Sequence, residues 1–103
     1  MKLYAAIGED GPDSARLRQQ HLAAHLDYVA AHLGDYAVAG PLRREGAPAG
    51  SLLVIKAKDE AAARARLEAD PYARAGVWPR LSLFEFAAVA GEWVGGAAWL
   101  RGT

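Results

Sequence analysis

The sequence contains no cysteine. This absence excludes disulfide bonds, thiolate nucleophiles and cysteine-ligated metal sites. It also has no excess of charge of either sign, because 12 lysine and arginine residues balance 12 aspartate and glutamate residues. Proteins that bind nucleic acid or an anionic membrane surface rely on positive charge. We therefore expect no nucleic-acid partner.

Long hydrophobic runs are missing as well. The N-terminal stretch MKLYAAIGEDGPD turns acidic and rich in glycine and proline after a few apolar residues. A signal peptide needs a longer apolar core, and a membrane span needs about 20 apolar residues. The sequence therefore predicts a cytoplasmic protein with no membrane partner.

Three familiar glycine-containing motifs are also absent. GEDGPD and REGAPAG lack the G-x-G-x-x-G or G-K-[ST] order that cradles phosphate. No G-x-S-x-G elbow is present, so we interpret Ser51 as a strand-start residue whose hydroxyl lines a pocket, and not as a nucleophile. We expect no nucleotide and no other cofactor.

What the chain does contain is enough apolar material for one domain, with 52% hydrophobic residues in 103. Turn residues and periodicity predict a βαββαβ order. The strands are expected at residues 2–8, 35–42, 50–57 and 79–87, the helices at 14–33 and 58–70, and a loop at 43–50. This order predicts an α+β fold with a four-stranded antiparallel sheet and two helices on one face.

The predicted sheet is apolar on both faces. In the third strand Leu52 and Val54 alternate with Leu53 and Ile55. Helices cover only one of these faces, and the other cannot remain in water. We expect a second copy of the chain to cover it, which gives a homodimer.

All three histidines lie on the first predicted helix, in RLRQQHLAAHLDYVAAHL. With Leu22 at 0° and 100° per residue, the apolar stripe that includes Leu26 centres at about 20°. His21, His25 and His32 fall at about 260°, 300° and 280°, and Arg18 at about 320°. The histidines are therefore expected on a half-buried flank of the stripe, where imidazole can meet a cleft and transfer protons near neutral pH.

Four segments carry a resemblance to a known family. RQQHL, AGPL, GSLLVI and DPYARAGV occur in an order and spacing that resemble the YciI-like (YCII-related) family over roughly residues 1–88. The resemblance implies a ferredoxin-like fold whose two open sheet faces pack together as a dimeric α/β barrel. Related barrels include small isomerases, monooxygenases and a dehydrochlorinase acting on ring compounds.

The resemblance also implies an active site. The family's histidine and aspartate fall on His21 and Asp70, with His21 as the acid or base and Asp70 orienting its ring. Arg18, three residues before His21, is then an anchor for an acidic substrate. His25, Ser51 and Tyr72 complete the expected substrate-binding residues.

Each of these residues has a structural alternative. Histidines on a helix flank commonly hydrogen-bond a backbone carbonyl or a carboxylate, and an aspartate before proline is a good helix N-cap, as Asp70 is before PYARAG. His21 and His25, four residues apart, could face one metal ion. The glutamate of H-E-x-x-H is absent, so we expect no metal.

Two functions stay open. One is cofactor-free acid/base catalysis, an isomerisation or elimination on a small anionic or cyclic metabolite. The other is a non-catalytic homodimeric module that binds a small ligand or serves as an accessory subunit of a larger system. The tail at residues 89–103 contains Trp93 and Trp99, and we expect it to pack on the 1–88 domain or on a partner subunit.

Overall fold

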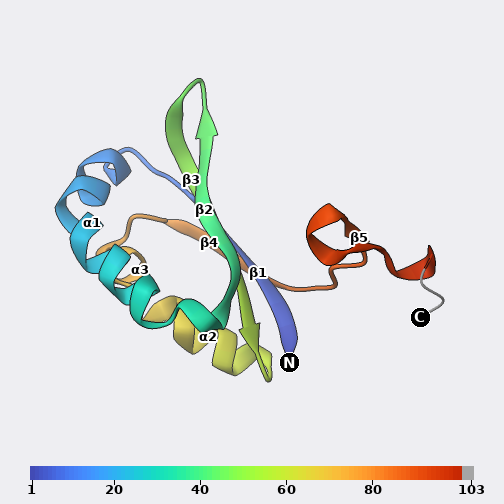
Figure 1. Ribbon diagram of the computed structural model, residues 1–103. Helices are drawn as coiled ribbons and strands as arrows, with labels where there is room; N and C mark the ends of the chain where they lie inside the picture. The colour runs from blue at the N-terminus through green and yellow to red at the C-terminus, as the bar shows by residue number, and fades with distance from the viewer. Residues whose placement is uncertain (101–103) are drawn as a thin grey trace.

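A computed structural model describes residues 1–100 of the protein, and its centre is one antiparallel sheet in the order β2-β3-β1-β4 (Figure 1). The strands are β1 (Lys2–Glu9), β2 (Tyr36–Arg44), β3 (Ala47–Ala57) and β4 (Arg80–Phe86). The helices are α1 (Ser14–Ala31), α2 (Glu60–Glu68) and α3 (Pro71–Ala75), with a 3-10 turn, η1, at Leu33–Asp35. The expected βαββαβ order and ferredoxin-like fold are confirmed.

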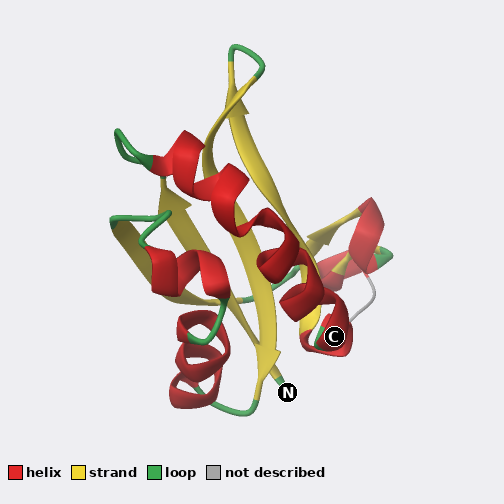
Figure 2. Cartoon of the chain, turned by 90° about the vertical axis from the view of Figure 1, so that its left-hand side faces the viewer, coloured by secondary structure: helices red, strands yellow, loops and turns green. Residues whose placement is uncertain are grey.

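The helices form one layer against one face of the sheet (Figure 2). The core between these layers combines alternate strand residues with aromatic and aliphatic side chains from the helical side. Its members include Tyr4, Ala6, Leu53, Ile55, Ala63, Leu67, Tyr72, Val77 and Trp78. Alternation puts Leu53 and Ile55 in this core and Leu52 on the opposite face, as the sequence predicts.

The expected loop at residues 43–50 is wrong. β2 continues through Gly40 and Pro41 to Arg44, and β3 begins at Ala47, so the two strands form a long hairpin. Glu45 and Gly46 make its turn, with φ values of 52° and 81°. Positive φ at both central residues matches the right-handed twist of a hairpin. Proline is tolerated because β2 is an edge strand.

Helix α1 is rotated from the orientation that its leucines predict. The half-buried residues of the helix are Leu17, Arg18, His21, His25, Tyr28 and Val29, and their mean direction is about 280° on the scale used above. Leu22 and Leu26, which the apolar stripe assigns to the core, remain 47% and 54% exposed. The histidine flank therefore faces the rest of the fold, and the leucines lie to one side of it.

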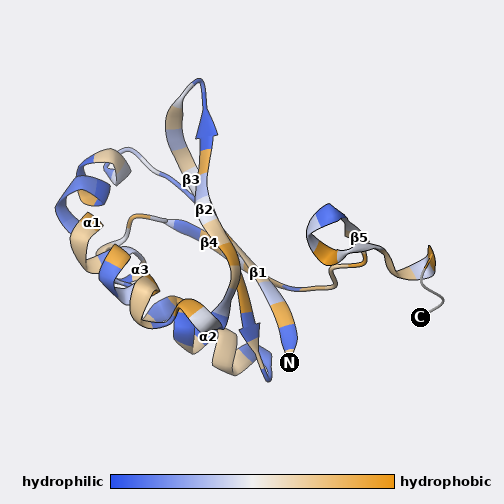
Figure 3. Cartoon of the chain, viewed as in Figure 1, coloured by the Kyte–Doolittle hydropathy of each residue, from blue (hydrophilic) through white to orange (hydrophobic). Residues whose placement is uncertain are grey.

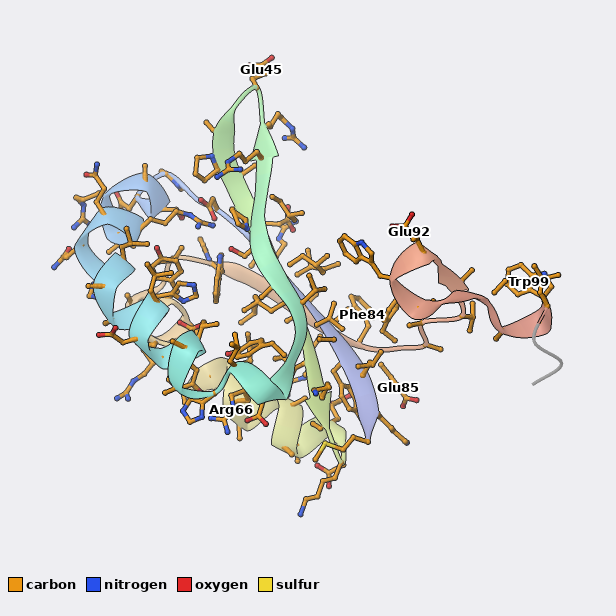
Figure 4. All side chains as sticks on the ribbon, viewed as in Figure 1. Glu45, Arg66, Phe84, Glu85, Glu92 and Trp99 are labelled. Carbon is orange, nitrogen blue, oxygen red and sulfur yellow. The ribbon has the colours of Figure 1, made fainter. Side chains whose placement is uncertain are left out.

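The sheet face opposite the helices is apolar and open. Phe84, Phe86 and Ile7 are 59%, 45% and 38% exposed. Figure 3 shows hydrophobic stretches along the strands, and Figure 4 shows Phe84 on the side turned away from the helices. This arrangement agrees with the sequence-based expectation of two apolar faces.

The segment after β4 lies on this open side and projects away from the domain (Figure 1). It consists of short elements: β5 (Ala90–Gly91), η2 (Glu92–Val94), β6 (Gly96–Ala97) and η3 (Ala98–Leu100). Trp93 is 86% exposed. A groove of about 490 Å³ separates the segment from the sheet and is bordered by Val38, Leu52 and Phe86. Of the tail expected at 89–103, residues 101–103 lie outside the described residues.

None of the helices within residues 1–100 is long and apolar enough to span a membrane.

At Gly8 the fold has a close approach that only glycine allows. A Cβ on Gly8 would lie 2.7 Å from Cδ1 of the Trp78 indole, so Gly8→Ala should destabilise the protein by about 2 to 3 kcal/mol through overpacking. Gly34→Ala, where a Cβ meets nothing within 4 Å, is the matched control and should change stability little. Urea unfolding of both variants measures the difference. Equal stability of the two would show that Trp78 does not pack on β1 as described.

Candidate active site

The candidate site begins with a buried carboxylate. Asp70 is 0% exposed and is the N-cap of α3, where its Oδ1 accepts a hydrogen bond of 2.8 Å from the Tyr72 backbone N–H. Pro71 favours this geometry, because proline suits the first helical position and keeps the preceding residue extended. The expected N-cap is confirmed. The cap also fixes where the carboxylate points.

The same carboxylate holds a histidine. Nδ1 of His25 lies 2.8 Å from Oδ1 and 3.0 Å from Oδ2 of Asp70. A carboxylate accepts hydrogen bonds, so Nδ1 carries the proton and Nε2 of the neutral ring is an acceptor. Nε2 has no hydrogen-bond partner within residues 1–100. The pair has the geometry of an oriented general base.

Two aromatic rings fix the imidazole plane. The Tyr72 ring stacks on His25 with centroids 3.8 Å apart and an interplanar angle of 1°. Trp78 approaches His25 edge-on at 6.4 Å and Tyr72 edge-on at 5.8 Å. Burial raises the pKa of the Tyr72 hydroxyl, which donates a 3.2 Å hydrogen bond to the Arg18 carbonyl. Tyr72 therefore acts as a neutral wall of the site.

Arg18 is held by a carboxylate of its own. Its Nε and Nη2 donate to the two oxygens of Asp10 at 2.8 and 2.9 Å, and Nη2 also donates to the Gly50 carbonyl at 2.9 Å. The hydrogen bonds that Arg18 donates to Asp10 raise the pKa of Arg18. The guanidinium also lies over the Tyr72 ring, 5.5 Å from the ring centroid. Arg18 is thus a fixed cation whose charge is balanced by Asp10.

Ser51 links Arg18 to the aromatic side chains of the site. Its Oγ accepts from Arg18 Nη2 at 3.1 Å and from Trp78 Nε1 at 3.2 Å. Ser51 is 6% exposed.

These residues border a cavity of about 350 Å³ between α1 and strands β2 and β3. Its polar wall comes from Arg18, His25, Ser51 and Tyr72. Its apolar wall comes from Leu22, Leu26, Val29, Ala39, Gly40, Pro41 and Leu53. The leucines displaced from the core by the rotation of α1 therefore line the cavity.

The sequence-predicted residues are only partly brought together. Arg18, His25, Ser51 and Tyr72 line one cavity, and Asp70 lies directly behind it. His21 does not line the cavity, and its side chain makes no hydrogen bond within residues 1–100. The expected pairing of His21 with Asp70 is wrong in this structure.

The rotation of α1 explains the exchange of histidines. Arg18 and His25 are two helical turns apart, at about 320° and 300°, whereas His21 is at about 260°. The shared direction of Arg18 and His25 was the available signal. His32 is at the end of α1, 4.7 Å from the Tyr28 ring, and away from the cavity. Asp10 and Trp78 were missed, because both act through contacts distant in sequence.

The comparisons with known proteins agree with this fold. The model of the YCII-related domain matches residues 2–87. The chain belongs to the YCII-related domain family. Among solved structures it is similar to the 5-chloro-2-hydroxyhydroquinone dehydrochlorinase of Burkholderia phenoliruptrix, in complex with 2,5-dihydroxybenzoquinone. The similarity has a TM-score of 0.75 and 24% identity, and covers 87% of this chain and 96% of that chain.

A second solved structure is a dimeric ferredoxin-like protein of unknown function from a Jannaschia species. It has a TM-score of 0.48 and 21% identity, and the alignment covers 85% of this chain and 100% of that one. No curated protein matches the sequence. The family match ends before the C-terminal segment, which begins after β4.

We also looked for side chains that could bind a metal ion. Across residues 1–100, no three histidine, aspartate or glutamate side chains gather closely enough to hold a metal ion. The expectation that the protein uses no metal stays a prediction.

The two roles of Asp70 can be separated by mutation. Asn keeps an oxygen that can cap α3 but cannot hold the tyrosine N–H and the His25 Nδ1–H as a carboxylate does. Asp70→Asn should therefore cost about 1 to 3 kcal/mol and move the His25 proton between the ring nitrogens. Asp59→Asn, at the N-cap of α2, is the control and should cost a few tenths of a kcal/mol. Urea unfolding and imidazole 15N shifts measure both effects. Equal losses in the two variants would leave Asp70 a helix cap only.

Proposed function

We propose that the protein is a cofactor-free acid/base catalyst that acts on a small cyclic molecule. The observation that carries the proposal is the His25 ring, whose Nδ1 is bound by buried Asp70 and whose Nε2 is unpartnered at a cavity wall. Such a pair can accept a proton at Nε2, and the carboxylate stabilises the imidazolium that forms.

The proton transfer supports two related reactions. His25 Nε2 takes a proton from a carbon or hydroxyl of the substrate, and the electron pair moves into the ring system. If the proton returns from His25 to a different atom, the outcome is an isomerisation. If a leaving group departs with the electron pair, the outcome is an elimination. Neither route needs an oxidant or reductant.

The cavity favours a largely apolar ligand. Seven of its lining residues are Leu, Val, Ala, Gly or Pro, and its volume of about 350 Å³ suits a single substituted ring. Arg18 is paired with Asp10, and Asp70 adds a second negative charge behind His25. The site therefore favours a neutral or singly ionised molecule over a dianion. The role of Arg18 as an anion anchor stays a prediction, supported by its place in the cavity wall.

The Burkholderia dehydrochlorinase gives this proposal a starting substrate. That protein has a similar fold, and its name and complex describe elimination from, and binding of, hydroxylated six-membered rings. At 24% identity the likeness establishes the fold alone. We carry the ring chemistry to this chain as a proposal because the cavity and the His25–Asp70 pair are compatible with it.

The alternative function is a module that binds a small ligand without turning it over. One observation favours it: the Tyr72 stack and the Asp70 hydrogen bonds hold His25 tightly on one side. A ring held only for binding would have the same environment. The two functions differ in whether removal of the imidazole base abolishes a reaction.

The three histidines provide this test. We expect His25→Gln to lower chloride release from 5-chloro-2-hydroxyhydroquinone by at least about 100-fold, since a general base contributes about 10² to 10⁴. His21→Gln and His32→Gln should retain the rate within about twofold, because neither side chain borders the cavity. Chloride is followed by ion chromatography.

Three outcomes contradict the assignment. Loss in His21→Gln with retention in His25→Gln would restore the sequence-based choice of base. Equal loss in all three would mean that the face of α1, and not one base, is required. Binding of the compound without any chloride release by the wild type would favour the binding module.

We also propose a homodimer formed by the open sheet face. Phe84, Phe86 and Ile7 leave that face apolar, and packed sheets lie about 10 Å apart. The C-terminal segment projects on the same side, where a partner sheet would lie beside it (Figure 1). The family resemblance and the apolar face support the same arrangement.

A charge on the open face tests the dimer. Phe84→Glu should shift the protein to a monomer in sedimentation velocity at micromolar concentration, because a desolvated carboxylate opposes face-to-face packing. Leu33→Glu is the control, since Leu33 is 66% exposed at the end of α1, on the helical layer. A wild type that sediments as a monomer, or a dimer that survives Phe84→Glu, would contradict this interface.

A further inference from the structure

The oxygen of Ser51 has an unusually complete set of donors. It accepts hydrogen bonds from Arg18 Nη2 at 3.1 Å and from Trp78 Nε1 at 3.2 Å. A serine hydroxyl has two lone pairs and one proton. Both lone pairs therefore face protein donors, although Arg18 Nη2 shares its two protons among Asp10, Gly50 and Ser51. Only the proton remains to be placed.

Neither neighbour can take that proton. Guanidinium and indole groups donate hydrogen bonds and have no acceptor. No other acceptor for the Ser51 hydroxyl is found within residues 1–100. Ser51 and His25 both line the cavity. We propose that the Ser51 hydroxyl is a fixed hydrogen-bond donor to an oxygen of the ligand, an inference that deepens the proposed function and rests on the same site.

The donors that fix Ser51 are themselves fixed. Arg18 is clamped by both oxygens of Asp10. Trp78 packs so closely on Gly8 of β1 that a Cβ there would overlap the indole ring. Hydrogen bonds in such a chain polarise one another, and a charged donor strengthens the next O–H. Arg18 is therefore a positioning residue that acts on the ligand through Ser51.

The two polar groups at the cavity wall have opposite roles. Ser51 can only donate to a ligand, and a His25 ring whose single proton is on Nδ1 accepts at Nε2. The ligand class that satisfies both has an acceptor oxygen and a separate acidic C–H or O–H on an apolar ring, as cyclic ketones and their enols do. When His25 removes the proton, negative charge moves onto the carbonyl oxygen, where the Ser51 O–H stabilises it.

The experiment compares two ring compounds that differ in one atom group. Cyclohexanone offers a carbonyl oxygen, and methylenecyclohexane replaces it with a CH₂ group of similar shape. Binding of each to the homodimer or monomer present in solution is titrated by protein-observed NMR. Ser51→Ala should weaken cyclohexanone binding about tenfold and change methylenecyclohexane binding by less than about twofold.

Two further variants serve as controls for this experiment. Ser82→Ala on β4 is the matched control, because Ser82 is a half-buried strand serine that does not border the cavity. It should leave both affinities unchanged. Ser51→Cys retains the side-chain shape with a weaker donor and should give an intermediate loss, which covers the case in which Ser51→Ala does not fold.

Each contrary result is specific. If Ser51→Ala weakens the binding of both compounds equally, Ser51 only forms part of the cavity wall. If it does not weaken cyclohexanone binding, Ser51 donates no hydrogen bond to the ligand. Either result overturns the proposal, and so does a wild-type protein that does not prefer cyclohexanone to methylenecyclohexane. Because binding is measured with His25 intact, it is independent of turnover. If the preference for cyclohexanone depends on Ser51 but chloride release is unchanged in His25→Gln, the acid/base function is rejected and the role of Ser51 as a hydrogen-bond donor stands.

Discussion

The burial of the Asp70 carboxylate is the constraint on which the site depends. A carboxylate with no exposed surface is costly unless its oxygens receive hydrogen bonds. Asp70 receives them from the first turn of α3 and from His25 on α1. Removing either donor would leave part of a buried charge unpaired. The helical layer is therefore tied together at the same atoms that orient the candidate base.

This constraint accounts for the orientation of α1. A helix that followed its leucines would turn Leu22 and Leu26 to the sheet and His25 away from Asp70. The structure does the reverse, with His25 inward and both leucines about half exposed. Full burial of one leucine yields roughly 1.5–3 kcal/mol, and because Leu22 and Leu26 are each about half exposed, the two together forgo about that amount. An unpaired buried charge costs several kcal/mol. Pairing the Asp70 carboxylate therefore determines the orientation of α1, and the two leucines line the cavity.

The same comparison shows what the sequence can and cannot predict. The strand order, the cap at Asp70 and the apolar second face follow from local patterns in this chain. The hairpin at Glu45 and Gly46 was missed because Gly40 and Pro41 look like a strand end unless the strand is known to be an edge. His21 was placed before His25 because the family resemblance assigned the histidine to RQQHL, and the helical periodicity carries no information about a distant carboxylate. Asp10 and Trp78 follow only from tertiary contacts.

Two carboxylates organise the polar wall in parallel ways, although neither borders the cavity. The hydrogen bond to Asp70 keeps the His25 proton on Nδ1 and leaves Nε2 as the acceptor at the cavity wall. Asp10 holds Arg18, which with Trp78 fills the lone pairs of Ser51 and leaves a donor inside. Each carboxylate thus orients one polar group at the cavity wall, an acceptor in the case of Asp70 and a donor in the case of Asp10. A site built in this way selects a ligand by the placement of a donor and an acceptor on an apolar frame.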